Sequence, residues 1–139
     1  MAGAVVVDTM IASAWLGTSQ SRRQARWAPV LQGVTWVLPF TVVAEMRFGA
    51  EVAGWGARRR GVLERLIERA GVVPPLEDVT AAYVDLRTWC VRSGHGLGGK
   101  EHEADRWVAA VALAGGLALA SDDAIFERLA GLNRIFPET

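Results

Sequence analysis

The chain has 139 residues, 51% of them apolar, and its 15 basic and 15 acidic residues give a formal net charge of zero. This length predicts one compact domain over residues 1–139, and the neutral balance argues against a polybasic protein that binds nucleic acid through its overall charge. The apolar runs are too short or too interrupted to span a bilayer as helices, no signal peptide is evident and the lone Cys90 permits no intramolecular disulfide, so we expect a cytoplasmic protein.

The first half of the chain alternates short apolar runs with segments of helical spacing. Residues 4–7 form an apolar run that ends at Asp8, which is typical of a buried parallel strand. After it we expect, in order, helices over residues 9–16 and 22–31, a strand over 36–38, a helix that Thr41 caps and that carries Glu45, and a helix over 63–70.

The second half continues this alternation. In order, we expect a brief strand over residues 72–73, a helix that Asp78 or Thr80 caps and that runs through Cys90, a flexible glycine-rich connection over 94–99, a helix over 103–114, a strand over 117–120, a short helix over 123–129 and a strand over 133–136. Because strands and helices alternate, the sequence predicts an α/β fold with a mainly parallel central sheet flanked by helices. The apolar neighbours of Cys90 indicate a buried, structural thiol.

Acidic residues stand at the ends of predicted strands and the starts of predicted helices. Four of the six aspartates have this placement: Asp8, Asp105, Asp122 and Asp123. Each of them alone could simply cap a helix. Together, however, carboxylates repel one another unless a cation or protons neutralise them, and oxygen ligands alone favour Mg²⁺ or Mn²⁺. His95 and His102 lack the spacing of a zinc site, although His102 could contact substrate or relay a proton near Asp105.

Fourteen of the fifteen basic residues are arginines, and they cluster at residues 22, 23 and 26 and at residues 58 to 60. Arginine can hold a phosphate through two parallel hydrogen bonds, but such clusters are equally consistent with a solvated helix face. The six tryptophans could stack on bases, yet Trp89 and Trp107 occupy helical positions typical of a core or a dimer face.

Four segments together resemble the PIN-domain family, and in particular the VapC-like toxins of bacterial toxin-antitoxin pairs. The segments are residues 5–9, which end in Asp8 and Thr9; residues 41–50, which contain Glu45; residues 105–113, which begin with Asp105; and residues 119–126, which contain Asp122 and Asp123. The chain departs from the family pattern at Met10, where many relatives carry a serine.

The resemblance implies a Mg²⁺- or Mn²⁺-dependent endonuclease that cleaves RNA. It implies an acidic site formed by Asp8, Glu45, Asp105 and Asp123, in which Asp8 and Asp105 are the main metal ligands and Asp122 is an alternative to Asp123. Thr9 is expected to hydrogen-bond around the site, and arginines such as Arg47 or Arg106 to hold flanking phosphates. The implied partners are a small antitoxin protein and a second copy of the chain in a homodimer.

Two other functions fit parts of the pattern. A metal-dependent phosphatase also places an aspartate after its first strand, but its chemistry usually requires a second acid two residues later, where this chain has Met10. A catalytically silent PIN-like module that only docks a partner would not need the full set of acids.

Overall fold

The computed structural model of the chain, which describes residues 3–17 and 19–138, contains a five-stranded sheet in which every pair of neighbouring strands is parallel. The strand order is β3-β2-β1-β4-β5. The strands are β1 (Ala4–Val7), β2 (Thr35–Pro39), β3 (Gly71–Val73), β4 (Ala118–Ala120) and β5 (Arg134–Ile135). The predicted parallel α/β fold is therefore confirmed.

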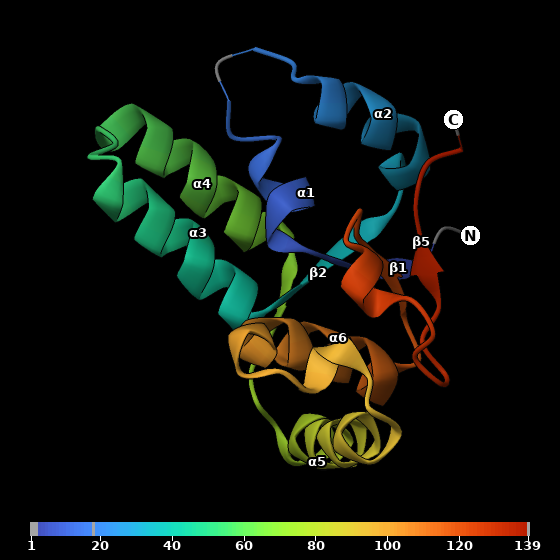
Figure 1. Cartoon of the computed structure of the whole chain (residues 1–139). Helices are drawn as coiled ribbons and strands as arrows, with labels where there is room; N and C mark the ends of the chain where they lie inside the picture. Colours follow the sequence, from blue (N-terminus) through green and yellow to red (C-terminus); the bar gives the residue numbers. More distant parts are fainter. Residues whose placement is uncertain (1–2, 18, 139) are drawn as a thin grey trace.

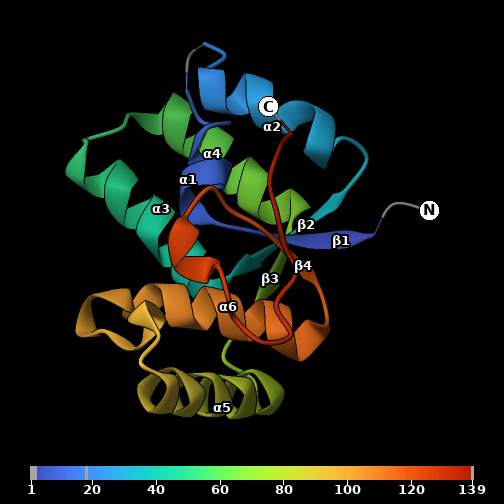
Figure 2. The ribbon, with the colours of Figure 1, turned by 45° about the vertical axis from the view of Figure 1, so that its right-hand side comes forward.

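Helices cover both sides of this sheet. The helices are α1 (Thr9–Ser13), α2 (Arg22–Leu31), α3 (Phe40–Val52), α4 (Ala57–Arg69), α5 (Glu77–Ser93) and α6 (Glu103–Gly115), with the short 3-10 turns η1 (Gly96–Gly98), η2 (Lys100–His102) and η3 (Ala124–Phe126). In Figures 1 and 2, α6 lies beneath the sheet with α5 outside it, while α1, α2 and α4 lie on the opposite side. None of the helices in the described ranges is long and apolar enough to cross a membrane.

The core forms where the central strand meets α6. Val6 and Val7 of β1 and Leu119 of β4 are fully buried, and β1 pairs with β2 on one side and with β4 on the other. Three alanines at positions 109, 110 and 112 give α6 a buried face of small side chains, so that the helix can approach the strands closely. Because β1 is central and buried on both faces, the position of Asp8 at its end is fixed by the core.

Several predicted elements differ in detail. Helix α3 begins at Phe40 after Pro39, so Thr41 lies inside the helix and is not its cap, and α5 begins at Glu77 without a side-chain cap. The expected helix over residues 123–129 is only the single turn η3, whose N-terminus Asp123 caps. Of the two expected roles of Trp89, the core position does not hold, because this side chain is 37% exposed, and the dimer face stays a prediction.

The glycine-rich segment is not the flexible connection that its composition predicted. It folds into η1 and η2, and Leu97 between its glycines is completely buried. This order matters for function because η2 leads directly into the first turn of α6, which carries Asp105.

Candidate active site

The order of the strands places a topological switch point at the carboxyl edge of the sheet. After β1 the chain first adds β2 and β3 on one side and later adds β4 and β5 on the other, so that the connections from β1 and β4 diverge. Ligands of open α/β sheets bind at such a point. The segment that follows β1 begins with Asp8, and the segment that follows β4 is Ser121-Asp122-Asp123.

Ser121 joins these two segments. Its hydroxyl donates a hydrogen bond to Asp8 Oδ2 at 2.8 Å and accepts one from the backbone N–H of Asp123 at 3.0 Å. The other Asp8 oxygen, Oδ1, accepts from the backbone N–H of Thr9 at 2.8 Å. Since Ser121 is completely buried, these bonds hold the Asp8 carboxylate in one orientation.

The electrostatics of Asp8 show that other acids lie nearby. Burial raises the pKa of Asp8, the hydrogen bonds from Ser121 and Thr9 oppose this shift, and the charges of Asp105 and Asp123 raise it further. The charged form of Asp8 is thus destabilised in the protein as it stands. A cation placed among these carboxylates would reverse that penalty.

Glu45 reaches the same region from α3. Glu45 is exposed at the surface, but partial desolvation of its carboxyl raises the pKa, and the charges of Asp8 and Asp105 raise it further. The structure therefore brings Glu45, Asp8 and Asp105 close enough to repel one another, although they come from three separate segments of the chain.

Asp105 lies in the first turn of α6 and contacts a histidine. His102 Nδ1 is 2.9 Å from Asp105 Oδ2, and both side chains are partly buried, with exposed fractions of 23% and 29%. The expectation that His102 could act near Asp105 thus has a direct contact behind it. The contact orients one oxygen of the carboxylate and leaves the other available.

Arg106 does not hold phosphates, contrary to our expectation. Its side chain is 1% exposed and donates to the carbonyl oxygens of Leu97 and Gly99 and to the carboxylate of Glu103. It also donates to the hydroxyl of Tyr83 on α5. Arg106 therefore ties η1 and η2 to α6 and supports the backbone that presents His102 and Asp105.

Arg47, the other arginine expected to hold phosphates, is already engaged. Its guanidinium donates two hydrogen bonds to the Glu64 carboxylate, at 2.7 and 3.1 Å, across the α3–α4 hairpin. Both side chains are more than half exposed, so the pair is solvated and a phosphate could compete for it. A role for Arg47 in phosphate binding stays a prediction.

Asp122 and Asp123, which the sequence leaves as alternatives, face different neighbours. Asp122 accepts hydrogen bonds from Trp27 Nε1 at 3.1 Å and from Arg23 and Arg26 at 3.3 and 3.5 Å, all on α2. Asp123 instead caps η3 through Ile125 N–H, and its charge acts on Asp8. Of the two, Asp123 is the one that lies toward the other acids.

Two threonines beside the acids have unused hydroxyl groups. Thr9 lies close to Glu45 and lowers the pKa of that carboxyl, yet its buried Oγ1 atom forms no hydrogen bond of good geometry with any described residue. Thr41 Oγ1, one helical turn before Glu45, is likewise buried and without a partner in the described part of the chain. Buried polar atoms of this kind point to a site that is completed by another group.

The donor chemistry of the site fits a hard divalent cation. Among the described residues no three His, Cys, Asp or Glu side chains lie close enough to hold one ion together. Mg²⁺, however, is commonly bound through only one or two carboxylates and keeps several of its waters. Asp8 and Asp105, with mutually unfavourable charges, are suited to that arrangement.

Sequence reasoning missed the roles of Ser121 and Arg106. Ser121 lies in the 119–126 segment of the family resemblance, and its place directly after a buried strand and beside two acids was the available signal. For Arg106 the available signal was Glu103, three residues earlier on the same helix; its two backbone carbonyl partners and Tyr83, which is 23 residues away, leave no pattern in the sequence.

The sequence matches a known family over most of its length. The PIN domain family model matches residues 5–132. VapC ribonuclease Y4jK of Sinorhizobium fredii is 32% identical to this chain over 139 residues. The alignment covers 96% of this chain and 96% of the relative.

Solved structures share the fold. VapBC2 from Rickettsia felis, bound to a DNA fragment from its promoter, has a TM-score of 0.78 at 18% identity and covers 96% of this chain and 98% of its own. FitAcB from Neisseria gonorrhoeae has a TM-score of 0.76 at 23% identity, over 96% of this chain and 97% of its own.

Proposed function

The chain belongs to the PIN-domain family, and on this premise we propose that it is a Mg²⁺- or Mn²⁺-dependent endoribonuclease that acts as the toxin of a VapBC-type pair. The observation that carries the proposal is the proximity of Asp8, Glu45 and Asp105 at the carboxyl edge of the sheet, where the charge of Asp105 raises the pKa of both Asp8 and Glu45 and the charge of Asp8 raises that of Glu45. Such a cluster destabilises the folded protein unless a cation binds there.

Asp8 and Asp105 are the residues that would hold the ion, with Glu45 and Asp123 completing the acidic pocket. A bound Mg²⁺ or Mn²⁺ supplies positive charge that favours deprotonation of an attacking water and offsets charge on the phosphodiester. In the hydrolysis the water oxygen bonds to phosphorus, one phosphorus–oxygen bond to a ribose breaks, and the departing oxygen takes a proton.

The surrounding residues keep the acids in position. Ser121 fixes the Asp8 carboxylate, His102 fixes one oxygen of Asp105, and Arg106 secures the backbone before α6. The Thr9 hydroxyl, unpartnered among the described residues, is available to hydrogen-bond to a water in the pocket. These contacts spare the acids from reorganising when substrate binds.

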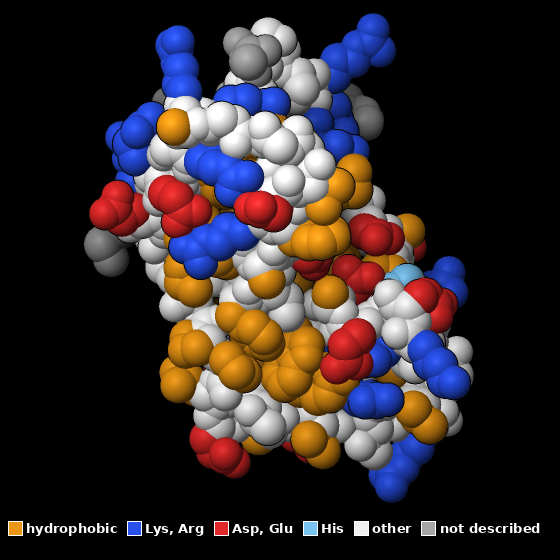
Figure 3. Space-filling view, turned by 90° about the vertical axis from the view of Figure 1, so that its left-hand side faces the viewer, with side chains coloured by type: hydrophobic (Ala, Val, Ile, Leu, Met, Phe, Trp, Pro, Cys, Tyr) orange, Lys and Arg blue, Asp and Glu red, His pale blue; other side chains and the backbone are white. Residues whose placement is uncertain are grey.

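A small antitoxin and a second copy of the chain are the proposed protein partners, and the cytoplasm is the proposed place of action. The similar structures include VapBC and FitAcB proteins. Figure 3 shows apolar side chains gathered on one face of this molecule. On α3 alone, Phe48 and Val52 are 70% and 71% exposed, and exposed apolar groups of this kind mark docking surfaces.

Cleavage of single-stranded RNA tests the activity. The protein with Mg²⁺ or Mn²⁺ is expected to cut RNA, and a chelator is expected to stop it. Asp8→Asn and Asp105→Asn should abolish cutting, whereas Asp85→Asn, which removes an exposed acid on α5, serves as the matched control. Cutting that persists in both site variants, shown to be folded, would discard the site.

A catalytically silent binding module is the second candidate. It is favoured by the finding that no three potential ligands among the described residues converge on one point. Calorimetric titration with Mn²⁺ separates the two, since a silent module predicts no heat of binding that depends on Asp8.

A further inference from the structure

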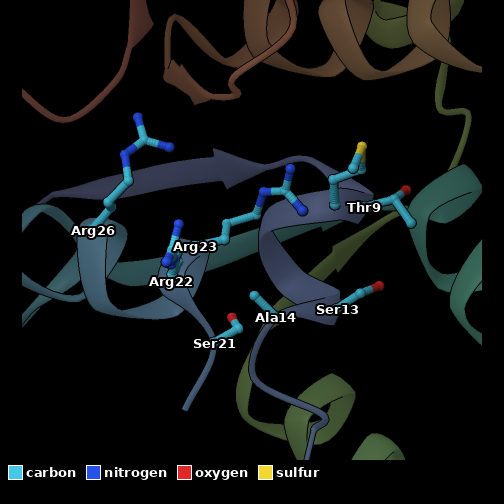
Figure 4. Close-up of a pocket in the computed structure, with 8 residues that line it drawn as sticks. Thr9, Ser13, Ala14, Ser21, Arg22, Arg23 and Arg26 are labelled. Carbon is cyan, nitrogen blue, oxygen red and sulfur yellow. The ribbon is translucent and has the colours of Figure 1, made fainter.

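An open, basic hollow lies directly beside the acidic site. It is formed between α1 and the start of α2, and Figure 4 shows the side chains that line it. The polar ones are Thr9, Ser13, Ser21, Arg22, Arg23 and Arg26. Thr9 belongs to both sites, because it follows Asp8 and lies close to Glu45.

Two of the three arginines stand where a helix least favours positive charge. Arg22 and Arg23 are the first two residues of α2, next to its N-cap Ser21, and α2 has no acidic residue of its own. The N-terminal end of a helix carries a partial positive charge, which repels cations and attracts anions. Arg22 and Arg26 are also four residues apart, a spacing at which like charges repel on a helix surface.

The protein neutralises this charge only in part. Asp122 is the one carboxylate that pairs with Arg23 and Arg26 in the described part of the chain, through contacts of 3.3 and 3.5 Å. Arg22 forms no ion pair or side-chain hydrogen bond with any described residue. Two guanidinium groups thus share one carboxylate and the third has none among the described residues, and Figure 4 shows the Arg23 side chain extending from α2 in the direction of α1.

We infer that this hollow binds a backbone phosphate of the RNA, next to the phosphodiester that lies at Asp8 and Asp105. The inference rests on the proposed ribonuclease function and adds the subsite that holds the substrate in register. Arg22 and Arg26 contact the phosphate oxygens, while Arg23, anchored by Asp122, closes the side toward Thr9. Arginine is suited to this contact because its planar fork matches a phosphate. Contacts of this type position the chain without selecting a base.

RNA binding at two salt concentrations tests the subsite. The background is the Asp105→Asn protein, so that bound RNA is not cut, and a labelled single-stranded RNA is titrated by fluorescence anisotropy at 50 and 200 mM salt. Each phosphate contact on a single strand contributes about 0.7 to the salt slope, so a fourfold rise in salt weakens binding by about 2.6-fold per contact. Arg22→Ala is expected to weaken binding at 50 mM salt and to reduce the salt dependence by about this factor.

Two matched variants complete the test. Arg22→Lys should retain most of the salt dependence because it keeps the charge, and Arg92→Ala, at an exposed arginine on the distant helix α5, should bind like the background protein. Equal affinity and salt slope for Arg22→Ala and Arg92→Ala would overturn the inference. The inference would also be overturned if Arg22→Ala left RNA binding unchanged and weakened only the binding of an acidic protein partner, because the hollow would then be a protein-docking site. RNA cleavage by the unmodified protein is measured separately, so that loss of the subsite and loss of the proposed function give different results.

Discussion

Ser121→Ala perturbs the one side chain that links the two acidic segments of the site. The substitution removes a hydrogen bond to the Asp8 carboxylate and leaves the Asp123 N–H without its acceptor. A hydrogen bond to a charged group is worth about 1.5–3 kcal/mol and a neutral one about 1 kcal/mol. Because Ser121 is completely buried, water does not replace it, and we expect the free energy of unfolding to fall by about 2–4 kcal/mol at neutral pH.

This loss is expected to depend on pH. The pKa of Asp8 is higher in the folded protein than in the unfolded chain, so protonated Asp8 contributes to the stability of the fold at low pH. This contribution is complete below the pKa of Asp8 in the unfolded chain and is lost as pH rises through its pKa in the folded protein. Ser121 opposes the raised pKa by stabilising the charged form. Removing it should therefore destabilise the protein more at pH 8 than at pH 4.

Urea unfolding at both pH values measures the effect. Ser93→Ala, which removes an exposed serine whose only side-chain bond is a 3.5 Å contact, is the matched control. A loss below about 0.5 kcal/mol at pH 8, the range of ordinary surface substitutions, would refute the assignment of Ser121 as the link. An equal loss at pH 4 and pH 8 would refute its action through the Asp8 charge.

Three further predictions follow from the same contacts. Asp8→Asn should stabilise the metal-free protein more at pH 7 than at pH 4, because it removes a partly buried carboxylate whose pKa is raised. A variant that unfolds at a lower temperature than the unmodified protein at pH 7 would contradict this. Arg106→Met should lower the free energy of unfolding, measured in urea, by about 3 kcal/mol, because the carbonyl oxygens of the η1–η2 segment lose their hydrogen-bond donor. A change under about 1 kcal/mol would show that this segment is stable without Arg106. Asp123→Asn should reduce RNA cleavage more than Asp122→Asn, because Asp123 acts on Asp8 whereas Asp122 pairs with residues of α2, and the opposite order in a cleavage assay would exchange their roles.

The sheet and most of its helices were predictable because their signals are local. The apolar run before Asp8 and the small-residue helix after Asp105 have patterns that require burial in the core, independently of the rest of the chain. Both elements form as expected. Asp8, Asp122 and Asp123 could be proposed as site residues for the same reason, since parallel strands bring their carboxyl ends to one edge. Their classification as a nuclease site, by contrast, came from the family resemblance.

The parts that could not be predicted depend on partners distant in the sequence. The glycine-rich segment is ordered because Arg106 donates to its backbone carbonyls, which no side-chain pattern encodes. Asp122 could not be set aside as an alternative to Asp123, because its partners on α2 are more than 90 residues away in the sequence. The local pattern around Trp89 was that of a core position, yet the side chain is partly exposed.

The proposed activity is metal-dependent cleavage of RNA at the acids of the carboxyl edge of the sheet. Its most direct test is the rate of RNA cleavage with saturating protein, measured against Mn²⁺ concentration for the unmodified chain and for folded Asp105→Asn protein. We predict Mn²⁺-dependent cleavage that falls by more than about 100-fold in the variant, the upper end of losses caused by removing partners outside the ligands themselves. Equal rates for the two proteins, or cleavage that does not depend on Mn²⁺ or Mg²⁺, would contradict the claim.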